Sequence, residues 1–144
     1  MQEILELKSE EKWLNVFPIL QSLRPNLTLE FFLNGRESLV SRDYHLLGLK
    51  SQGEVVCVAG YVLHPHVEQG TEFWLHDFAT LPEERSKGYG LNMLVFLEKL
   101  AAEKGCKRIL LHTRVERFRA QQFYSKRANY QEYALVYRKE LNNT

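Results

Sequence analysis

Residues 85–90 read Arg-Ser-Lys-Gly-Tyr-Gly, and this short basic turn is where we expect the chemistry of the chain. Its two glycines let backbone amides approach a ligand without obstruction from a Cβ atom. A helical pattern opens at Gly90, so the unsatisfied N–H groups and positive dipole end of a helix point at the same place. With the charges of Arg85 and Lys87, these features predict a binding site for a phosphate or pyrophosphate.

The segments on either side of the turn are those that an anion site needs. Residues 73–80 read as a strand, and Met93, Leu94 and Leu97 recur at helical spacing after the turn. A strand, a phosphate turn, a helix and a further strand form a βαβ unit. This context favours an anion site over an ordinary solvated turn. A P-loop or a dinucleotide-binding turn fits less well, because their lysine-serine pair and third glycine are missing.

The remaining segments predict an α/β (mixed α+β) fold. Two N-terminal helices begin after the capping residues Ser9 and Thr28, and we expect a kink or a break at Pro18. Further helices are expected from residue 90 to about 104 and from 118 to about 126. Strands are expected at residues 3–7, 44–50, 54–63, 73–80, 108–113 and 133–139. Three consecutive antiparallel strands then form the centre of the sheet, and a polar connection runs from His64 to Gly70.

Length and composition narrow the class of protein. The 144 residues, 44% of them hydrophobic, predict a single domain spanning residues 1–144. A formal net charge of +1 gives no electrostatic basis for nucleic-acid binding. Neither a signal peptide nor a membrane-spanning run is recognisable, so we expect no membrane association and a cytoplasmic location. The two cysteines, Cys57 and Cys106, are expected to be free thiols.

Two segments together resemble a known family. Residues 75–90, which contain the glycine turn, resemble the acetyl-CoA-binding core of the GNAT N-acetyltransferases, whose signature is Arg or Gln, two residues, Gly, one residue, Gly or Ala. Residues 117–124, Arg-Phe-Arg-Ala-Gln-Gln-Phe-Tyr, are similar to the later family segment that carries an alanine and a Phe-Tyr pair. The predicted order of helices and strands is also that of the family, so the resemblance covers essentially the whole chain.

The resemblance implies an acetyl-CoA-dependent N-acetyltransferase with a mostly antiparallel sheet and a β-turn-α-β cofactor core. It implies direct attack by a primary amine in a ternary complex, with acetyl-CoA as acyl donor; separately, we expect no metal, because no ligand spacing joins the histidines. The pyrophosphate would bind the turn, and the pantetheine arm would lie along the end of the fourth strand. The implied cofactor-binding residues are Phe78, Ala79, Thr80, Arg85, Ser86, Lys87, Gly88, Tyr89, Gly90, Leu91, Arg117 and Phe123.

Proton transfer gives the catalytic candidates. The family commonly uses a tyrosine at the position of Tyr124 to protonate the departing thiolate, against the alternative of a core tyrosine. Either Asp77 or His76 could accept the proton of the amine. Because neighbouring side chains alternate along a strand, we expect these two to point to opposite faces of the sheet.

Some features depart from the family pattern or stay open. Arg117 stands where many members have asparagine, and the glycine and aromatic residue that often follow the tyrosine have a different spacing here. The histidines lack the spacing of a metal site. The acceptor is a small-molecule or peptide amine, for which we expect a lining of Phe31, Phe32, Tyr44, Trp74 and residues 64–70. A homodimer stays open, as does the alternative of a non-catalytic acyl-CoA-binding or interaction module.

Overall fold

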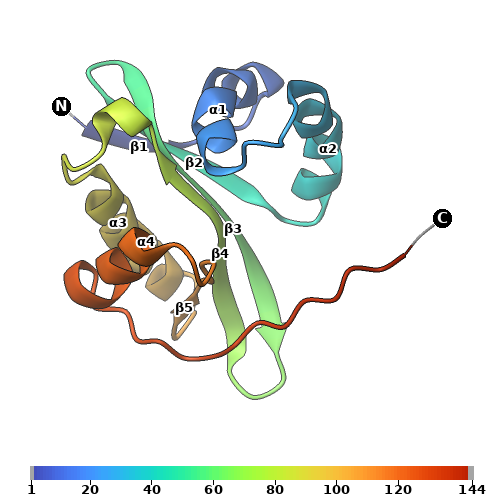
Figure 1. Cartoon of the computed structure of the whole chain (residues 1–144), viewed down its shortest axis with the longest axis vertical. Helices are drawn as coiled ribbons and strands as arrows, with labels where there is room; N and C mark the ends of the chain where they lie inside the picture. The colour runs from blue at the N-terminus through green and yellow to red at the C-terminus, as the bar shows by residue number, and fades with distance from the viewer. Residues whose placement is uncertain (1, 143–144) are drawn as a thin grey trace. The chain divides into compact units, whose positions relative to one another are not determined.

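A five-stranded mixed sheet forms the centre of the computed structural model, which describes residues 2–142 (Figure 1). The chain divides into one compact unit that runs to Leu111 and a second that begins at His112. The sheet lies in the first unit and consists of β1 (Gln2–Glu6), β2 (His45–Ser51), β3 (Glu54–His66), β4 (Gly70–Thr80) and β5 (Ile109–Leu110), in that spatial order. Neighbouring strands are antiparallel except β4 and β5, which are parallel. This architecture confirms the predicted α/β fold.

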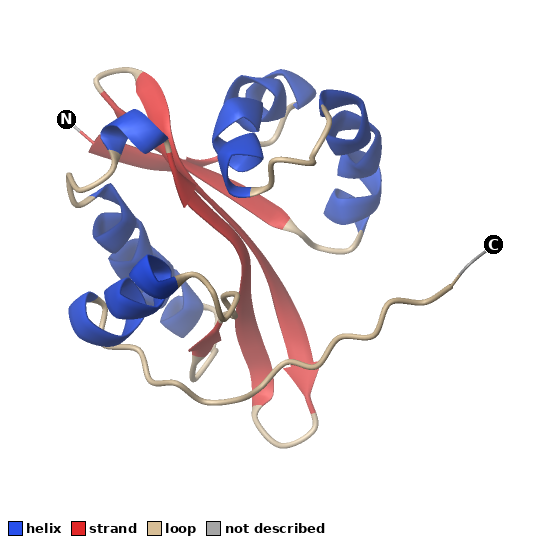
Figure 2. Cartoon of the chain, in the orientation of Figure 1, coloured by secondary structure: helices blue, strands red, loops and turns tan. Residues whose placement is uncertain are grey.

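Helices cover both faces of this sheet (Figure 2). On one face lie α1 (Glu10–Leu23) and α2 (Leu29–Ser41), and on the other lies α3 (Tyr89–Glu103), preceded by the short 3₁₀ helix η1 (Pro82–Glu84). The second unit contains α4 (Phe118–Gln122), which continues as the π-helical turn η2 (Phe123–Arg127). No helix formed by residues 2–142 has both the length and the apolar character needed to cross a membrane.

The first two helices form where local sequence and packing agree. The Ser9 side chain accepts a hydrogen bond from the Lys12 amide at 3.2 Å, and the Thr28 side chain accepts one from the Phe31 amide at 3.1 Å. These caps satisfy amides that the first turn of a helix leaves free. Between the helices and the sheet, a hydrophobic core is formed by Leu7, Trp13, Val16, Ile19, Leu20, Phe32, Tyr44, Leu46 and Val58.

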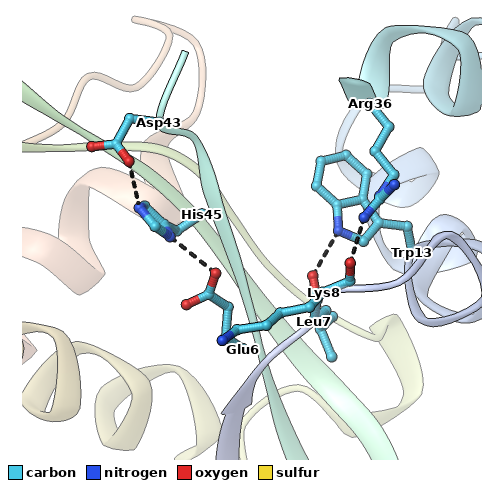
Figure 3. A network of polar contacts seen from close by, with 7 residues as sticks. All are labelled: Glu6, Leu7, Lys8, Trp13, Arg36, Asp43 and His45. Atoms are coloured by element: carbon cyan, nitrogen blue, oxygen red, sulfur yellow. Dashed lines mark hydrogen bonds and ion pairs between the residues drawn. The ribbon is translucent and has the colours of Figure 1, made fainter. Parts of the chain in front are cut away.

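Polar contacts close the corner where β1, α1, α2 and β2 meet (Figure 3). The Trp13 Nε1 donates to the Leu7 carbonyl at 2.8 Å, and Arg36 donates to the Lys8 carbonyl. His45 lies between two carboxylates, with Nδ1 3.0 Å from Glu6 and Nε2 3.1 Å from Asp43. The start of β2 is thereby fixed to the end of β1 and to the α2–β2 loop.

The structure differs from the predictions for α1 and β3 at two prolines. Of the kink or break expected at Pro18, no break occurs, because α1 continues through this residue. The segment His64-Pro65-His66 does not open the connection to β4 but is the last part of β3, with Pro65 opposite Thr71. Proline is tolerated there because β2 pairs with β3 only as far as Tyr61, so the proline nitrogen need not donate to a ladder.

The last two predicted strands are shorter than expected or absent. In place of a strand at 108–113, β5 has two residues, Ile109 and Leu110, whose partners in β4 are Phe73 and Trp74. Residues 133–139 form no strand, and their side chains are exposed. An apolar pattern predicts the tendency to form a strand, but a ladder also needs a partner strand, and none of the described residues provides one for this segment.

Candidate functional site

The glycine turn leads directly into α3, as the sequence predicts. Gly88 is the N-cap residue and has φ +86°, a left-handed conformation that favours glycine. No side chain caps this helix, and its first backbone bond runs from the Asn92 amide to the Gly88 carbonyl at 3.0 Å. The amides of Tyr89, Gly90 and Leu91 therefore lie ahead of the first turn as donors that no helical carbonyl accepts. Such a helix end can bind an anion.

The charged residues of the turn differ in their surroundings. Arg85 is exposed and forms no ion pair with any residue between 2 and 142. The Lys87 Nζ lies 2.5 Å from Glu84 Oε2, and this hydrogen bond and the glutamate charge raise the pKa of Lys87 above its usual value. Tyr89 and Ser51 face each other through their hydroxyls at 3.0 Å, which ties the start of α3 to the end of β2. The turn thus offers one unpaired and one paired cation.

The end of β4 has an open edge. On one side its residues pair with β3, up to Thr80 opposite Cys57. On the other side β5 pairs only with Phe73 and Trp74, and no other strand within residues 2–142 continues the ladder past Trp74. From Phe78 to Thr80 this side of β4 therefore has no neighbouring strand among residues 2–142, which is the arrangement to which an extended ligand adds as a further strand. This edge leads straight into η1 and the glycine turn.

The strand is irregular at the two candidate proton acceptors. Asp77 lies opposite Gly60 and Leu75 opposite Tyr61, so His76 is an extra residue in the register of β4, a β-bulge. The His76 ring stacks on Trp74 with centroids 6.2 Å apart, and the Asp77 carboxylate contacts Tyr44 in the core beneath α1. The opposite orientation that we expected is wrong, because the bulge interrupts the alternation and both side chains lie on the α1 and α2 face.

Both carboxylate oxygens of Asp77 are already engaged. Its Oδ1 accepts a hydrogen bond from Arg24 Nε at 2.9 Å, and its Oδ2 accepts one from the Tyr44 hydroxyl at 2.6 Å. His76 is exposed, and its ring also contacts His64 at a centroid distance of 5.8 Å. The sequence did not identify Arg24 as a site residue. A signal was present in Gly60, because a glycine inside an apolar strand often marks a bulge or a close approach.

The other candidates from the C-terminal segment lie in the second unit. Arg117 is the N-cap residue of α4, and Phe123 and Tyr124 open the π-helical turn η2. The Tyr124 ring lies 5.4 Å from that of Phe123 and 6.1 Å from that of Tyr130, and the Tyr130 amide donates to the Tyr124 carbonyl at 2.7 Å. A π-helical turn is uncommon and occurs frequently at functional sites.

The expected acceptor lining separates into core and surface residues. Phe32 and Tyr44 are buried in the core, whereas Phe31 is 75% exposed. Trp74 is half-buried and lies against the rings of His64 and His76 on the open face of the β3–β4 hairpin. Among residues 2–142, no group of three or more metal-binding side chains comes together.

Comparisons with known proteins agree with this geometry. A family model described as "Acetyltransferase (GNAT) family" matches residues 9–130. A Bacillus subtilis (strain 168) protein named "Uncharacterized N-acetyltransferase YhdJ" is 27% identical over 140 residues, which cover 96% of this chain and 99% of the relative.

Solved structures have the same fold. A GNAT family acetyltransferase from Staphylococcus aureus subsp. aureus USA300_TCH1516 superposes with a TM-score of 0.76 at 22% identity, over 98% of each chain. The enzyme AAC(6')-Iy, in complex with the bisubstrate analog CoA-S-monomethyl-acetylneamine, superposes with a TM-score of 0.78 at 17% identity, over 98% of this chain and 99% of the other.

Proposed function

Because the chain belongs to the GNAT family of acetyltransferases, we propose that this N-acetyltransferase takes its acetyl group from acetyl-CoA and transfers it to a primary amine by direct attack in a ternary complex. The observation that carries the proposal is the uncapped N-terminus of α3 directly after the open edge of β4. A pyrophosphate fits the first feature and a peptide-like arm fits the second.

The cofactor half of the proposed site lies in the first unit. The amides from Ser86 to Leu91, including those of Lys87, Gly88, Tyr89 and Gly90, would donate to the pyrophosphate, with Arg85 as a neighbouring charge. The edge groups of Phe78, Ala79 and Thr80 would pair with the pantetheine arm. We also propose Arg117 and Phe123 of the second unit as cofactor-binding residues, because they match the family segment. We further propose that both units belong to one acetyltransferase domain, because the family model spans the boundary between them.

The proposed chemistry needs positioning, charge stabilisation and two proton transfers. Holding the amine and the thioester together supplies much of the rate, since it removes the entropy cost of a bimolecular encounter. A main-chain N–H near Phe78 would stabilise the negative charge that develops on the thioester oxygen. The amine proton would go to His76 or Asp77, and the exposure of His76 supports the histidine. Tyr124 would protonate the departing thiolate.

The chemical class of the acceptor is proposed from a solved structure with the same fold. The AAC(6')-Iy complex contains an acetylneamine moiety joined to CoA, which supports attack by an amine that is bound beside the donor in that enzyme. For this chain we propose a small-molecule or peptide amine that approaches from the face carrying Trp74 and His76.

Ligand binding and thiol release together test the proposal. Acetyl-CoA at about 100 times its Kd should raise unfolding stability by about 2.7 kcal/mol, whereas ATP and NAD at the same concentration should not. Adding amines from a panel should then release free CoA thiol. Background from the protein should be low, because both cysteines are buried and burial raises the pKa of each, that of Cys57 to about 11 and that of Cys106 above its usual value. Stabilisation without thiol release from any amine would reduce the protein to a binding module.

The same assay tests Tyr124. Tyr124→Phe should lower kcat by at least about tenfold while the Kd for acetyl-CoA stays close to that of the wild type, as expected for an interaction used only in the transition state. Tyr137→Phe is a matched control, because Tyr137 is 88% exposed. An unchanged kcat in Tyr124→Phe would remove this residue from the mechanism.

A further inference from the structure

The extra residue in β4 has an unusual partner for its carbonyl. A β-bulge leaves a residue outside the ladder, and here that residue is His76. Its carbonyl accepts a hydrogen bond from Arg24 Nη2 at 3.2 Å, and the Nε of the same guanidinium donates to Asp77 Oδ1 at 2.9 Å. Arg24 is the C-cap residue of α1, so the end of that helix contacts the bulge.

A second contact reaches the bulge from the start of β2. Tyr44 extends across β3 at Gly60, and its hydroxyl donates to Asp77 Oδ2 at 2.6 Å. Any side chain at Gly60 would collide with the phenol of Tyr44, so the contact requires glycine at that position. The Tyr44 ring is buried and packs edge-on against Trp13 with centroids 5.9 Å apart. The phenol is therefore held by the core and reaches the strand through its hydroxyl.

The protonation states of Arg24, Tyr44 and Asp77 keep the hydrogen bonds between them intact. Burial raises the pKa of Tyr44 well above its usual value, and the neighbouring Asp77 charge and hydrogen bond raise it further, against a smaller opposing effect of Arg24. The phenol thus stays a neutral donor. Asp77 accepts from both sides, and a carboxylate held by a guanidinium and a phenol has little freedom to rotate. The bulge is fixed from α1 and β2 at once.

We propose that Arg24 and Tyr44, acting through Asp77, are positioning residues that hold the β4 bulge and so set the main chain at Phe78 for acetyl transfer. This inference rests on the proposed function, in which the groups from Phe78 to Thr80 receive the thioester and the pantetheine arm. Asp77 directly precedes Phe78, so a rotation of the bulge would turn the amides that follow. Asp77 then serves to position the strand, and proton acceptance falls to His76.

Turnover measurements separate positioning from a merely structural role. Tyr44→Phe keeps the buried ring and removes only the hydroxyl, and it should lower kcat by about tenfold to a hundredfold because small misplacements of reacting groups are that costly. The Kd for acetyl-CoA should rise by a smaller factor than kcat falls, since the pyrophosphate turn is separate and only the contacts to the pantetheine arm are disturbed. The matched control is Tyr61→Phe, which removes another buried tyrosine hydroxyl next to Gly60 without touching Asp77. An equal loss of kcat in both variants, or an unchanged kcat in Tyr44→Phe, would overturn the proposal.

A substitution at Arg24 leaves the core undisturbed, because the side chain is 53% exposed. Arg24→Lys keeps the positive charge and loses the planar fork that contacts the His76 carbonyl and Asp77 together. We expect kcat to fall by about tenfold with little change in Tm. Arg42→Lys, at the corresponding C-cap of α2, is the matched control. A fall in Tm alone, with kcat retained, would make Arg24 a structural residue only.

Amide hydrogen exchange tests the same contact without any substrate. In Tyr44→Phe and Arg24→Lys, those amides of residues 77–80 that pair with β3 should exchange faster by about tenfold, whereas those of α3 should be unchanged. A wild-type protein without turnover would refute the proposed function, and the exchange result would still decide whether the bulge is held as we infer. Unchanged exchange at residues 77–80, or an equal increase throughout α3, would refute the inference.

Discussion

The N-termini of α1 and α2 differ from that of α3 in how their free amides are satisfied. At α1 and α2, Ser9 and Thr28 accept hydrogen bonds from the amides of Lys12 and Phe31. At α3 the N-cap is Gly88, which has no side chain to offer and holds a left-handed φ. The first two helices complete their first turn with a side chain of their own, whereas α3 has no such cap, and we propose that a phosphate of the ligand accepts from its free amides.

The caps of α1 and α2 contribute to the stability of the fold, whereas the uncapped end of α3 does not. A side-chain cap contributes about 1 kcal/mol to the stability of a helix or a protein, and α3 lacks that contribution. The packing of Met93, Leu94 and Leu97, all fully buried, compensates for it. The N-terminus of α3 can thus remain open because the other positions of the helix hold it in place.

The largest expected effect is at Gly88. Gly88→Val places a β-branched side chain at φ +86°, where the left-handed conformation costs about 1–2 kcal/mol. The turn should shift to a different conformation, and acetyl-CoA affinity should fall by at least about tenfold, because the amides of the turn no longer converge. Titration calorimetry measures the loss. Since no atom lies within 4 Å of a Cβ at Gly88, a measured loss would come from the backbone rather than from a steric clash within the protein. Unchanged affinity would contradict the proposal that the uncapped N-terminus of α3 binds the pyrophosphate.

A smaller effect is expected at the two cations of the turn. Arg85→Gln should weaken acetyl-CoA binding by about threefold to tenfold, and the loss should shrink at high salt because exposed charges are screened. Lys87→Gln should weaken it less, since Glu84 already neutralises much of the lysine charge. Affinities of both variants at low and high ionic strength provide the measurement. A larger effect at Lys87 would mean that its ion pair opens when the ligand binds.

The smallest effect on binding is expected at the capped helices. Ser9→Ala and Thr28→Ala should each lower the free energy of unfolding by about 1 kcal/mol, with no change in the Kd for acetyl-CoA. Chemical denaturation and calorimetry give the two quantities. The expected pattern is the reverse of that at Gly88, where binding falls more than stability. A cap variant that lost affinity would show that the helix ends are energetically coupled.

Local signals in the sequence predicted most of the first unit. The caps at Ser9 and Thr28 and the glycine turn before α3 depend on neighbouring residues, and each lies where the pattern places it. The assignment of the site to phosphate chemistry depends on the same local features. The roles proposed for the individual turn residues remain predictions.

The errors arise where one segment depends on another that is distant in the sequence. The bulge at His76 reflects Tyr44 and Arg24, which lie 33 and 53 residues from Asp77, and no alternation within β4 could predict it. The segment at residues 133–139 has the composition of a strand, but composition does not supply a partner. The short length of β5 likewise reflects its pairing, which reaches only Phe73 and Trp74 of β4.

The position of Pro65 has a consequence for how this protein behaves among other copies of itself. Past Tyr61 the hairpin of β3 and β4 extends beyond β2, so the far part of β3 is an edge to which none of the described residues adds a strand (Figure 1). An edge of this kind is a template on which foreign strands can grow into aggregates. Pro65 interrupts that template, since it has no N–H to donate and its ring obstructs an approaching strand. Pro65, which the sequence placed in the connection to β4, therefore disfavours aggregation through this edge.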